Sequence, residues 1–406
     1  MRVAVVTETF PKLSETFVVN HIRGLMDAGI DVDVYAFYRQ QEEKSNPFVE
    51  AYGMPGHTRY KPTEPLAKLP RLYGGIRILA RNPGHLHTLL RSLDVSRLGM
   101  EALRLHRLYE ASTFLTDRRY DIVHCHFGLT GEKIALFQGW GLLQAPLVTS
   151  FHGYDLDDRT VVRPGMYRHL QSVGRLYIAN SFYTRQRLAD FGFDKSRVLV
   201  EPVSLDTGFF SRRTERALKP FRMLSVGRLV PFKGVEYALR ALARLRDMYS
   251  ADFVYTIVGS GPLEGRLVAL ASELGLGEQV RMVGDRTPDE VRDLMEDTHA
   301  LLLTGIRSDE GRVENQGLVL QEAQSMQVPV IASAVGGIPE GLIDGESGFL
   351  VPERDVPAIA DRIRRLIEDP SLVDTMGHAG RRFVEGRYDI PSATQRILCS
   401  YKALLR

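Results

Sequence analysis

Cysteine and tryptophan are scarce in this chain, which has two cysteines and one tryptophan among 406 residues. Cys125 and Cys399 are too few for a disulfide framework, which excludes the small disulfide-stapled secreted domains. No run approaches the ~18 uninterrupted apolar residues of a spanning helix, because even the run 134–148 is broken by Gln138 and Gln144. The first ten residues lack the apolar core and cleavage site of a secretion signal. We therefore expect a reducing, cytoplasmic location.

Length and composition predict two globular domains. A chain of 406 residues is too long for one ordinary core, and 44% hydrophobic with 25% charged residues is typical of globular proteins. Residues 1–200 hold 26 basic and 20 acidic side chains, although the net charge of the whole chain is only +2. The second half is therefore net acidic, which indicates different partners for the two halves.

A strand–helix–strand rhythm predicts an α/β fold with parallel sheets. Residues 2–7 read as a buried strand, 16–28 as an amphipathic helix ended by Gly29, and 31–37 as a second strand. The rhythm fails between 39 and about 98, where prolines interrupt it, and returns later in both halves. We expect an N-terminal Rossmann-like domain (1–203) with a basic insertion at about 40–106, a C-terminal Rossmann-like domain (204–387) and a last helix within 388–406.

Two glutamates mark the segment around which the second domain is organised. Glu314 and Glu322 are separated by seven residues, and a helix is predicted to begin near Gly317. A short buried strand (328–332) and the turn Gly336-Gly337 follow. Helix N-termini favour anions such as a diphosphate, and carboxylates accept hydrogen bonds from sugar hydroxyls. A nucleotide-sugar has both parts.

A second motif supplies cations for the same ligand. Gly227-Arg228-Leu229-Val230-Pro231-Phe232-Lys233-Gly234 follows the predicted strand 221–226 and opens a helix. Arg228 offers a planar fork and Lys233 a compact charge, and together they suit a diphosphate. The alternative is that Arg228 and Lys233 are two solvated charges in a loop, but the glutamate segment favours the functional interpretation.

Together these motifs resemble the signature of the retaining, nucleotide-sugar-dependent glycosyltransferases of family 4, which have the GT-B fold. The resemblance rests on the GRLVPFKG motif at 227–234, the two glutamates and the VPVIASAVGGIPE run at 328–340. It implies two Rossmann-like domains facing a cleft, with the last helix crossing back to the first domain. It also implies a UDP- or GDP-linked sugar donor as co-substrate, no cofactor, Glu322 on the ribose and Glu314 on the donor sugar.

The resemblance extends the predicted site to further residues. His152 follows a strand and matches the histidine that contacts the donor sugar, although a structural histidine stays an alternative. The predicted catalytic residues are thus His152, Glu314, Arg228 and Lys233. The predicted donor-binding residues are Arg228, Lys233, Gly259, Asp285, Arg286, Glu314, Asn315, Gln316, Gly317, Leu318 and Glu322. Asn315 and Gln316 replace the glycine and aromatic residue common in the family, so the donor sugar does not carry over.

On the acceptor side we single out Ser14, Glu15 and His126. Family members often have a glycine pair where this chain has Ser14 and Glu15, and capping of the first helix is the favoured alternative role for both. Strand alternation places His124 and His126 on one face and Cys125 on the other. A metal site cannot be assembled locally from these three residues, so structural histidines are favoured there.

No metal is expected in the reaction. Asp155-Leu156-Asp157 matches the D-x-D pattern of metal-dependent sugar transferases, and it stays open as an alternative. We favour metal independence because Arg228, Lys233 and helix N-termini supply positive charge for the departing diphosphate. Retention of configuration is implied by the resemblance alone.

The acceptor is expected at a membrane. Between Arg59 and Arg107 the sequence has ten basic and three acidic residues, mixed with leucines, isoleucines and tyrosine. Such a mixture suits an anionic membrane surface, whereas a basic insertion packed on the first domain is the plainer alternative. We expect a peripheral protein at the inner leaflet that extends a lipid-linked saccharide for surface polysaccharide and binds no nucleic acid. The rival functions are a sugar-nucleotide epimerase or hydrolase and a non-catalytic binding protein.

Overall fold

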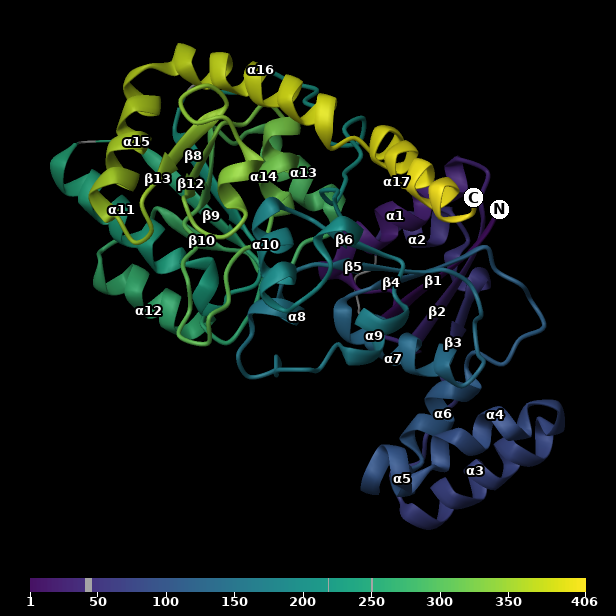
Figure 1. Cartoon of the computed structure of the whole chain (residues 1–406). Coiled ribbons are helices and arrows are strands. Elements are labelled where there is room, and N and C mark those ends of the chain that lie inside the picture. The colour runs from purple at the N-terminus through teal and green to yellow at the C-terminus, as the bar shows by residue number, and fades with distance from the viewer. Residues whose placement is uncertain (41–45, 218, 250) are drawn as a thin grey trace.

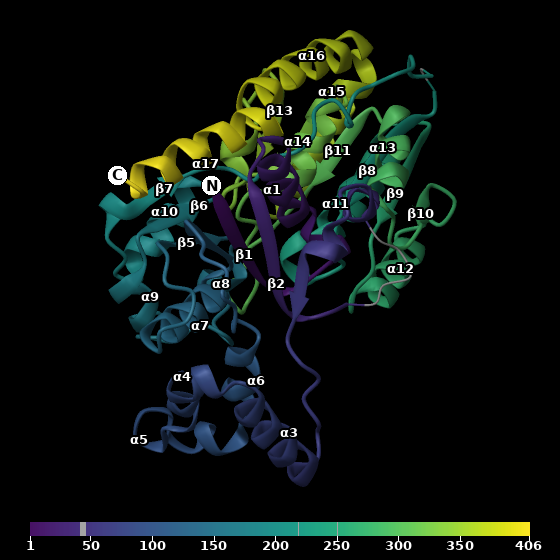
Figure 2. The ribbon, with the colours of Figure 1, turned by 90° about the vertical axis from the view of Figure 1, so that its right-hand side faces the viewer.

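The computed structural model describes residues 1–40, 46–217, 219–249 and 251–406. Two parallel sheets, each covered by helices on both faces, form the two halves of the molecule (Figures 1 and 2). Each sheet has the predicted doubly wound α/β architecture. Among the described residues, no helix is long and apolar enough to cross a lipid bilayer.

The first sheet has seven strands in the order β3-β2-β1-β4-β5-β6-β7, all parallel. Its strands are β1 (Arg2–Thr9), β2 (Asp31–Tyr38), β3 (Thr58–Tyr60), β4 (Ile122–His126), β5 (Leu147–Phe151), β6 (Leu176–Ala179) and β7 (Val198–Val200). Its helices are α1 (Thr16–Asp27), α2 (Pro47–Ala51), α7 (Gly128–Gly139), α8 (Tyr154–Asp157), α9 (Arg168–Val173) and α10 (Phe182–Asp190).

The second sheet has six strands in the order β10-β9-β8-β11-β12-β13. Its strands are β8 (Phe221–Val226), β9 (Phe253–Val258), β10 (Val280–Met282), β11 (Ala300–Leu303), β12 (Val330–Ser333) and β13 (Gly348–Val351). Its helices are α11 (Val235–Met248), α12 (Glu264–Glu273), α13 (Pro288–Glu296), α14 (Leu318–Ser325), α15 (Val356–Glu368) and α16 (Pro370–Arg387). The interior strands β11 and β12 are fully buried, as continuous apolar runs in parallel sheets predict.

The last helix, α17 (Ile390–Leu404), returns to the first domain and lies beside α1 (Figure 1). Leu398 and Tyr401 of α17 are buried in the same core as Ile22 and Leu25 of α1. The first domain is therefore built from both ends of the chain, which agrees with the crossing expected from the resemblance.

The expected insertion at 40–106 is only partly separate from the first domain. Within it, α2 contacts α1, and β3 pairs with β2 at the edge of the sheet, so the chain keeps the βα rhythm as far as residue 60. The predicted loss of the rhythm from residue 39 onward is therefore wrong for β3, because a three-residue edge strand gives no periodic signal. Residues 41–45 lie outside the described residues.

A small helical lobe, residues 66–105, follows β3 and projects from the first domain (Figures 1 and 2). Its helices are α3 (Lys68–Arg81), α4 (Leu86–Leu90) and α5 (Val95–Leu98), and α6 (His106–Ser112) joins it to the domain. Gly74 and Gly75 let α3 approach α6 closely, because a Cβ on Gly74 would lie 2.1 Å from the Tyr109 hydroxyl. Helical structure thus begins again at residue 68, inside the segment where the rhythm of strands and helices was predicted to fail.

Candidate active site

The central cleft lies where the strand order of each sheet reverses. These points are β1/β4 in the first sheet and β8/β11 in the second, and ligands of doubly wound sheets bind outside the strand carboxyl ends at such points. Loops that follow these strands line a cleft of about 530 Å³ between the domains. The site residues predicted from separate motifs are therefore brought together mainly by topology.

The second domain contributes a charged wall. Lys233 forms an ion pair with Glu314, and both side chains are about 15% exposed at the cleft. Arg228, on the same loop, is exposed and lines the cleft, and no described residue forms an ion pair with it. The arrangement thus holds one cation against a carboxylate and leaves another available for an anion.

Three glycines allow the charged loops to come this close. Gly234 has a φ of 61°, and a Cβ there would lie 1.9 Å from the Thr304 carbonyl oxygen. Cβ atoms on Gly336 and Gly337 would lie 2.1 Å and 1.9 Å from the carbonyl oxygens of Glu314 and Asn315. The Gly336-Gly337 turn therefore supports the backbone that carries Glu314, and the Gly337 amide donates to the Glu314 carbonyl at 2.9 Å.

Glu322 lies on α14, one turn after Gly317, whose φ of 77° starts the helix. Burial raises the pKa of Glu322 to about 7, and the charge of Lys233 acts in the opposite direction. Its carboxyl group lines the cleft together with Gly317 and Leu318, and no described residue forms a hydrogen bond with it. Glu322 is thus a poised acceptor for ligand hydroxyl groups.

Asn315 and Gln316 line the cleft, but their side-chain amides are engaged within the protein. Asn315 donates to Asp157 at 3.1 Å and accepts from Thr184 at 3.0 Å, both in the first domain. Gln316 exchanges two hydrogen bonds with the backbone of Val203, between the domains. These residues join the two domains, and their contact with the donor stays a prediction.

The first domain surrounds His152 with aromatic side chains, although its charged residues Lys12, Glu15, Asp157 and Asp158 also line the cleft. His152 lies beside Phe17 and Phe127, with ring centroids 4.4 Å and 4.9 Å away. Ser14 and Glu15 also reach the cleft. Their predicted capping of the first helix is wrong, because Glu15 at the N-cap makes no side-chain capping bond and instead pairs with Lys12 at 2.6 Å.

His126 lies behind His152 and outside the lining of the cleft. Its Nδ1 is 3.0 Å from His152 Nε2, and the residue is 3% exposed. An acceptor contact is thus not available to His126 in this structure. The predicted alternation holds, since Cys125 belongs to the core on the opposite face of β4.

The D-x-D pair is engaged in local structure. Asp155 accepts from the backbone amides of Gly128 and Gly153 at 2.7 Å and 2.9 Å, and Asp157 pairs with Arg187 at 2.8 Å. Burial raises the pKa of Asp155 to about 6. The two carboxylates therefore hold the loop after β5 and α10, which is a role that the sequence pattern does not reveal.

Gly259, Asp285 and Arg286 lie in loops after β9 and β10. Gly259 has a φ of 125°, and a Cβ there would lie 2.1 Å from the carbonyl oxygen of Gly227, so it packs against the cationic loop. Ser260 donates to Asp285 at 2.7 Å, and Arg286 donates to the Asp285 carbonyl. None of the three lines the cleft, and the nucleobase contact stays a prediction for Asp285 and Arg286.

Sequence reasoning missed Glu340, the last residue of the VPVIASAVGGIPE run. Its carboxylate accepts from the backbone amides of Phe182 and Tyr183 at 2.8 Å and 3.0 Å, at the N-terminus of α10 in the first domain. A carboxylate at a helix N-terminus is favoured by the unpaired amides and by the helix dipole. Only the fold reveals this contact, because its partners lie over 150 residues away.

Fold and site together define a glycosyltransferase with the GT-B architecture. Two family models match along the chain: "Glycosyltransferase Family 4" over residues 14–209 and "Glycosyl transferases group 1" over residues 206–383. The chain belongs to the family 4 glycosyltransferases, which also excludes the sugar-nucleotide epimerase alternative.

Particular relatives come from bacterial polysaccharide synthesis. The chain is 31% identical over 368 residues to a Salmonella typhimurium protein assigned as the colanic acid biosynthesis glycosyltransferase WcaL, covering 89% of this chain and 90% of that one. It is 28% identical over 398 residues to the amylovoran biosynthesis glycosyltransferase AmsK of Erwinia amylovora, covering 96% of each.

Solved structures share the fold at lower identity. Anabaena HepE in complex with UDP-glucose has a TM-score of 0.72 and 17% identity, covering 99% of this chain and all of that one. Sucrose-phosphate synthase from Thermosynechococcus elongatus has a TM-score of 0.71 and 20% identity, covering 100% and 99%. The predicted GT-B fold is confirmed.

Proposed function

We propose that this glycosyltransferase moves a hexose from a UDP- or GDP-linked donor to a lipid-linked saccharide, with retention of configuration and without a metal ion. The observation that carries the proposal is the cleft that joins Arg228, the Lys233–Glu314 pair and Glu322. The names of WcaL and AmsK support a role in surface polysaccharide assembly. The UDP-glucose bound to HepE is the kind of donor expected here.

Arg228 and Lys233 would bind the diphosphate and stabilise the charge that develops when its bond to the anomeric carbon breaks. When the donor binds, Lys233 is shared between the phosphate and Glu314, and Glu314 is then held ready for sugar hydroxyls. Glu322 accepts from the ribose hydroxyls. His152 faces the donor sugar from the first domain.

Metal independence rests on how charges are distributed in the cleft. Four cations line it, and among them Arg228 has no ion-pair partner among the described residues and Lys233 shares Glu314. Asp155 and Asp157, in contrast, hold backbone amides and Arg187. We expect activity to survive exhaustive chelation with EDTA, measured by product formation against an untreated sample. If EDTA abolishes activity and Mg²⁺ or Mn²⁺ restores it, the diphosphate would instead be bound through a metal ion held by Asp155 and Asp157.

The decisive experiment for the function is a donor screen with purified protein. Labelled UDP- and GDP-sugars are incubated with and without a membrane extract, and products are separated into free sugar, nucleotide-sugar and lipid fraction. Transfer of label into the lipid fraction, dependent on the extract, supports the proposal. Release of free sugar without acceptor would show a hydrolase, and tight donor binding without turnover a binding protein.

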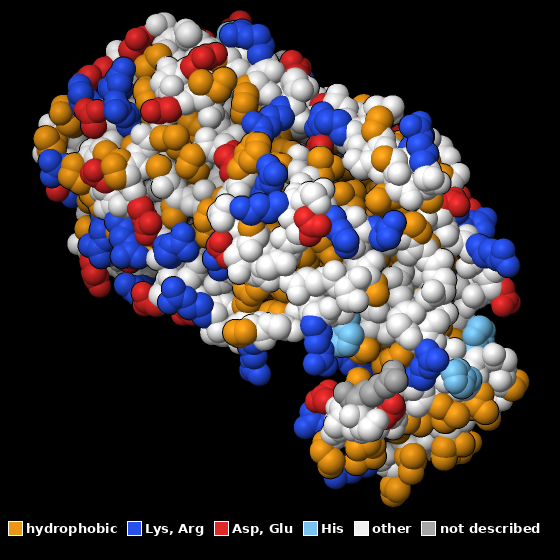
Figure 3. Space-filling model, viewed as in Figure 1, with side chains coloured by type: hydrophobic (Ala, Val, Ile, Leu, Met, Phe, Trp, Pro, Cys, Tyr) orange, Lys and Arg blue, Asp and Glu red, His pale blue; other side chains and the backbone are white. Residues whose placement is uncertain are grey.

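The helical lobe is the proposed membrane surface. It carries ten of the nineteen large hydrophobic side chains that are exposed among the described residues, and they gather at the tip of the lobe in Figure 3. These ten are Leu66, Leu69, Leu72, Tyr73, Ile76, Leu86, Leu90, Val95, Met100 and Leu103. Exposed apolar patches of this kind mark interaction sites.

Helix α3 shows how apolar and basic groups share this surface. Leu69, Tyr73 and Ile76 recur at helical spacing on its outer side, with Leu69 81% and Tyr73 71% exposed. Lys68, Arg77 and Arg81 are exposed on the same helix, whose sequence has no acidic residue. An apolar stripe flanked only by cations favours anionic lipid over a protein of mixed charge.

Other basic residues of the region have structural roles. Arg71 donates to the carbonyls of Pro65 and Leu66 and pairs with Glu64, and Arg107 pairs with Glu110. The side chain of Arg97 lies outside the described residues. The membrane contact is therefore assigned to Lys68, Arg77 and Arg81 and to the apolar side chains beside them.

Flotation with vesicles tests this surface. We compare phosphatidylcholine vesicles with vesicles that also contain phosphatidylglycerol, and the wild type with Lys68→Glu/Arg77→Glu/Arg81→Glu. Each basic residue near an anionic surface contributes ~1 kcal/mol, so the triple variant should bind on the order of 10²-fold more weakly. The matched control, Arg240→Glu/Arg244→Glu/Lys402→Glu, changes the charge equally on exposed positions away from the lobe.

Two outcomes would overturn the membrane assignment. Equal binding of wild type and lobe variant to both vesicle types would show that the basic residues of the lobe make no electrostatic contact with lipid. A concentration-dependent dimer that Leu69→Ser/Tyr73→Ser/Ile76→Ser abolishes, without vesicle binding by the wild type, would show that a second copy covers this surface. On the proposal, the serine variant stays monomeric and loses vesicle binding.

A further inference from the structure

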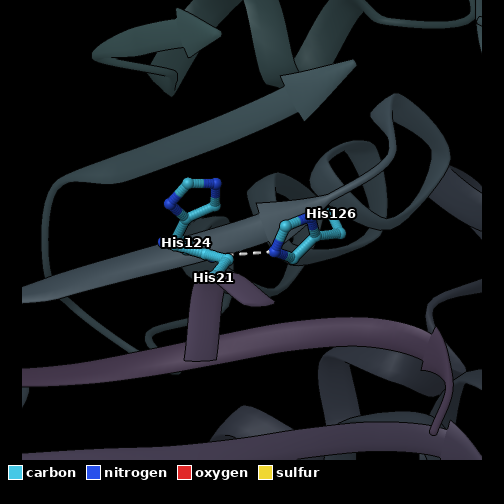
Figure 4. Close-up of side chains that lie close together, drawn as sticks. All are labelled: His21, His124 and His126. Carbon is cyan, nitrogen blue, oxygen red and sulfur yellow. Dashed lines mark hydrogen bonds between the residues drawn. The ribbon is translucent and has the colours of Figure 1, made fainter. Parts of the chain in front are cut away.

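Four histidines and a tyrosine form a continuous hydrogen-bonded chain behind the first-domain wall of the cleft. The residues come from β4, the end of β5, α1 and α17, which are far apart in the sequence (Figure 4 shows three of the rings). The hydrogen-bonded order, from the interior to the cleft, is Ser150, His124, Tyr401, His21, His126, His152.

Each link of the chain joins specific ring nitrogens. His124 Nε2 lies 2.7 Å from the Ser150 hydroxyl, and its Nδ1 contacts the Tyr401 hydroxyl. That hydroxyl lies 3.3 Å from His21 Nε2, and His21 Nδ1 lies 2.9 Å from His126 Nε2. With the 3.0 Å contact between His126 Nδ1 and His152 Nε2, each of the three inner histidines uses both of its nitrogens.

The rings of this chain are neutral. Burial lowers the pKa of His21 to about 4 and that of His152 to about 3, and it holds the pKa values of His124 and His126 well below their usual range. A neutral imidazole has one donor and one acceptor nitrogen. When the Tyr401 hydroxyl donates to one neighbouring histidine and accepts from the other, every hydrogen bond runs in the same direction along the chain, and the tautomer of one ring fixes the tautomers of the others.

The chain ends at a residue that lines the cleft. His152 Nδ1 is buried and has no hydrogen-bond partner among the described residues. Such orphan atoms are uncommon, and each requires an explanation. The Nε2 atom of the same ring is the end of the chain, so the chain decides whether Nδ1 carries the proton.

A metal ion is the competing explanation for the cluster. Nitrogens of His21, His124 and His126 lie within 4.8 Å of one another, which is close enough for shared ligation. All six nitrogens of these rings already have hydrogen-bond partners. Ligation would therefore break at least two bonds of the chain, so the hydrogen-bonded arrangement accounts for the contacts better.

We propose that His21, His124, His126 and Tyr401 are positioning residues that hold His152 in one tautomer and one ring orientation. Because Nδ1 is buried in this structure, it meets a donor or acceptor hydroxyl only when the side chains around His152 move, and that hydroxyl then finds a defined partner instead of a mixture of two. Through Tyr401, the last helix contributes a link to this chain. The catalytic consequence rests on the proposed role of His152, whereas the single tautomer does not.

Tyr401→Phe tests the chain with the smallest change in volume, because it removes only the hydroxyl between His124 and His21. The matched control is Tyr177→Phe, which removes a buried tyrosine hydroxyl of the same domain that bonds the Leu170 carbonyl outside the chain. Both variants are compared with the wild type by ¹⁵N NMR of the imidazole nitrogens, which distinguishes the tautomers. No substrate is needed for this measurement.

We expect one tautomer for each ring of the chain in the wild type and in Tyr177→Phe, and two exchanging tautomers of His152 in Tyr401→Phe. In the transfer assay Tyr401→Phe should lose about tenfold in kcat, within the up to 10²-fold cost of a misplaced group. The donor KM should change less than twofold. Tyr177→Phe should keep wild-type kcat, although it should lose about as much thermal stability as Tyr401→Phe.

Several results would overturn the proposal, and they separate it from the proposed function. Mixed tautomers in the wild type, or an unchanged His152 spectrum in Tyr401→Phe, would refute the chain whatever the enzyme transfers. Stoichiometric metal in the purified protein, bound at His21 by the same spectra, would replace the chain with a metal site. If both variants lost kcat equally while the ¹⁵N spectra still showed one tautomer for each ring, Tyr401 would have only a structural role.

Discussion

The two walls of the cleft are built on different principles. On the second-domain side, Arg228 and Lys233 lie on the loop after β8, Glu314 on the loop after β11 and Glu322 in the first half of α14, so charged groups dominate. On the first-domain side, charged residues stand at the cleft as well, but His152 is backed by a buried hydrogen-bonded chain of neutral groups instead of by charges. One wall is suited to bind an anion, and the other to place a hydrogen-bonding group without adding charge.

The largest predicted effect is a loss of stability at low pH, which arises from the buried histidine chain. The pKa values of His21, His124 and His126 are lowered by burial, so below the usual pKa of about 6.5 the unfolded chain binds more protons than the folded one. Stability then falls with decreasing pH, by up to roughly 1.4 kcal/mol per pH unit for each such group. His152 and His299, whose pKa values burial also lowers, add to this slope.

Urea unfolding between pH 7.5 and 5 measures this loss. Glu322 and Asp155, whose pKa values burial raises, act in the opposite direction over the same range. The control is the variant His57→Gln/His87→Gln, which removes two histidines that are not buried and should keep the same slope. A free energy of unfolding that stays flat from pH 7 to pH 5 would show that the three rings are not held neutral.

Removal of Lys233 should disable the charged wall. Lys233→Ala loses the cation aimed at the diphosphate and leaves Glu314 without its partner, so kcat should fall on the order of 10²–10³-fold. Steady-state transfer with the donor found in the screen gives the number, and Lys195→Ala, an exposed lysine far along the chain, serves as the control. Near-wild-type turnover of Lys233→Ala would refute the diphosphate assignment.

The smallest predicted effect concerns Glu322 and the affinity for the donor. Because burial raises its pKa to about 7, the carboxylate form that accepts from ribose hydroxyls increases between pH 6 and pH 8. Donor affinity in the absence of acceptor should therefore rise over that range, as measured by calorimetry. Glu322→Gln should bind about tenfold more weakly, as loss of a charge-assisted hydrogen bond implies, and should bind equally at both pH values.

The sequence predicted the charged wall far better than the histidine chain, for a physical reason. Arg228 and Lys233 follow one strand, Glu314 and Glu322 follow another, and parallel topology brings the carboxyl ends of those strands together. Local spacing therefore carried most of the information. The two-domain α/β architecture and most strands followed from the same periodicity.

The histidine chain could not be predicted in the same way. His21, His126 and Tyr401 are buried neighbours only because α17 returns to α1, and no local spacing relates residue 401 to residue 21. The sequence also does not show which polar side chains are already bonded within the protein. Gln316 is bonded to Val203, and Asp157 is paired with Arg187. The short strand β3 was missed because three residues are too few for a period.

The return of α17 has a consequence for the order in which the molecule is made. Ile22, Leu25 and the ring of His21 lie under a helix that a ribosome supplies more than 350 residues later. Until residues 390–404 emerge, the first domain exposes an apolar face, and His124 and His21 each lack one hydrogen-bond partner. Although domains usually fold in the order of synthesis, here the first domain reaches its final state after the second.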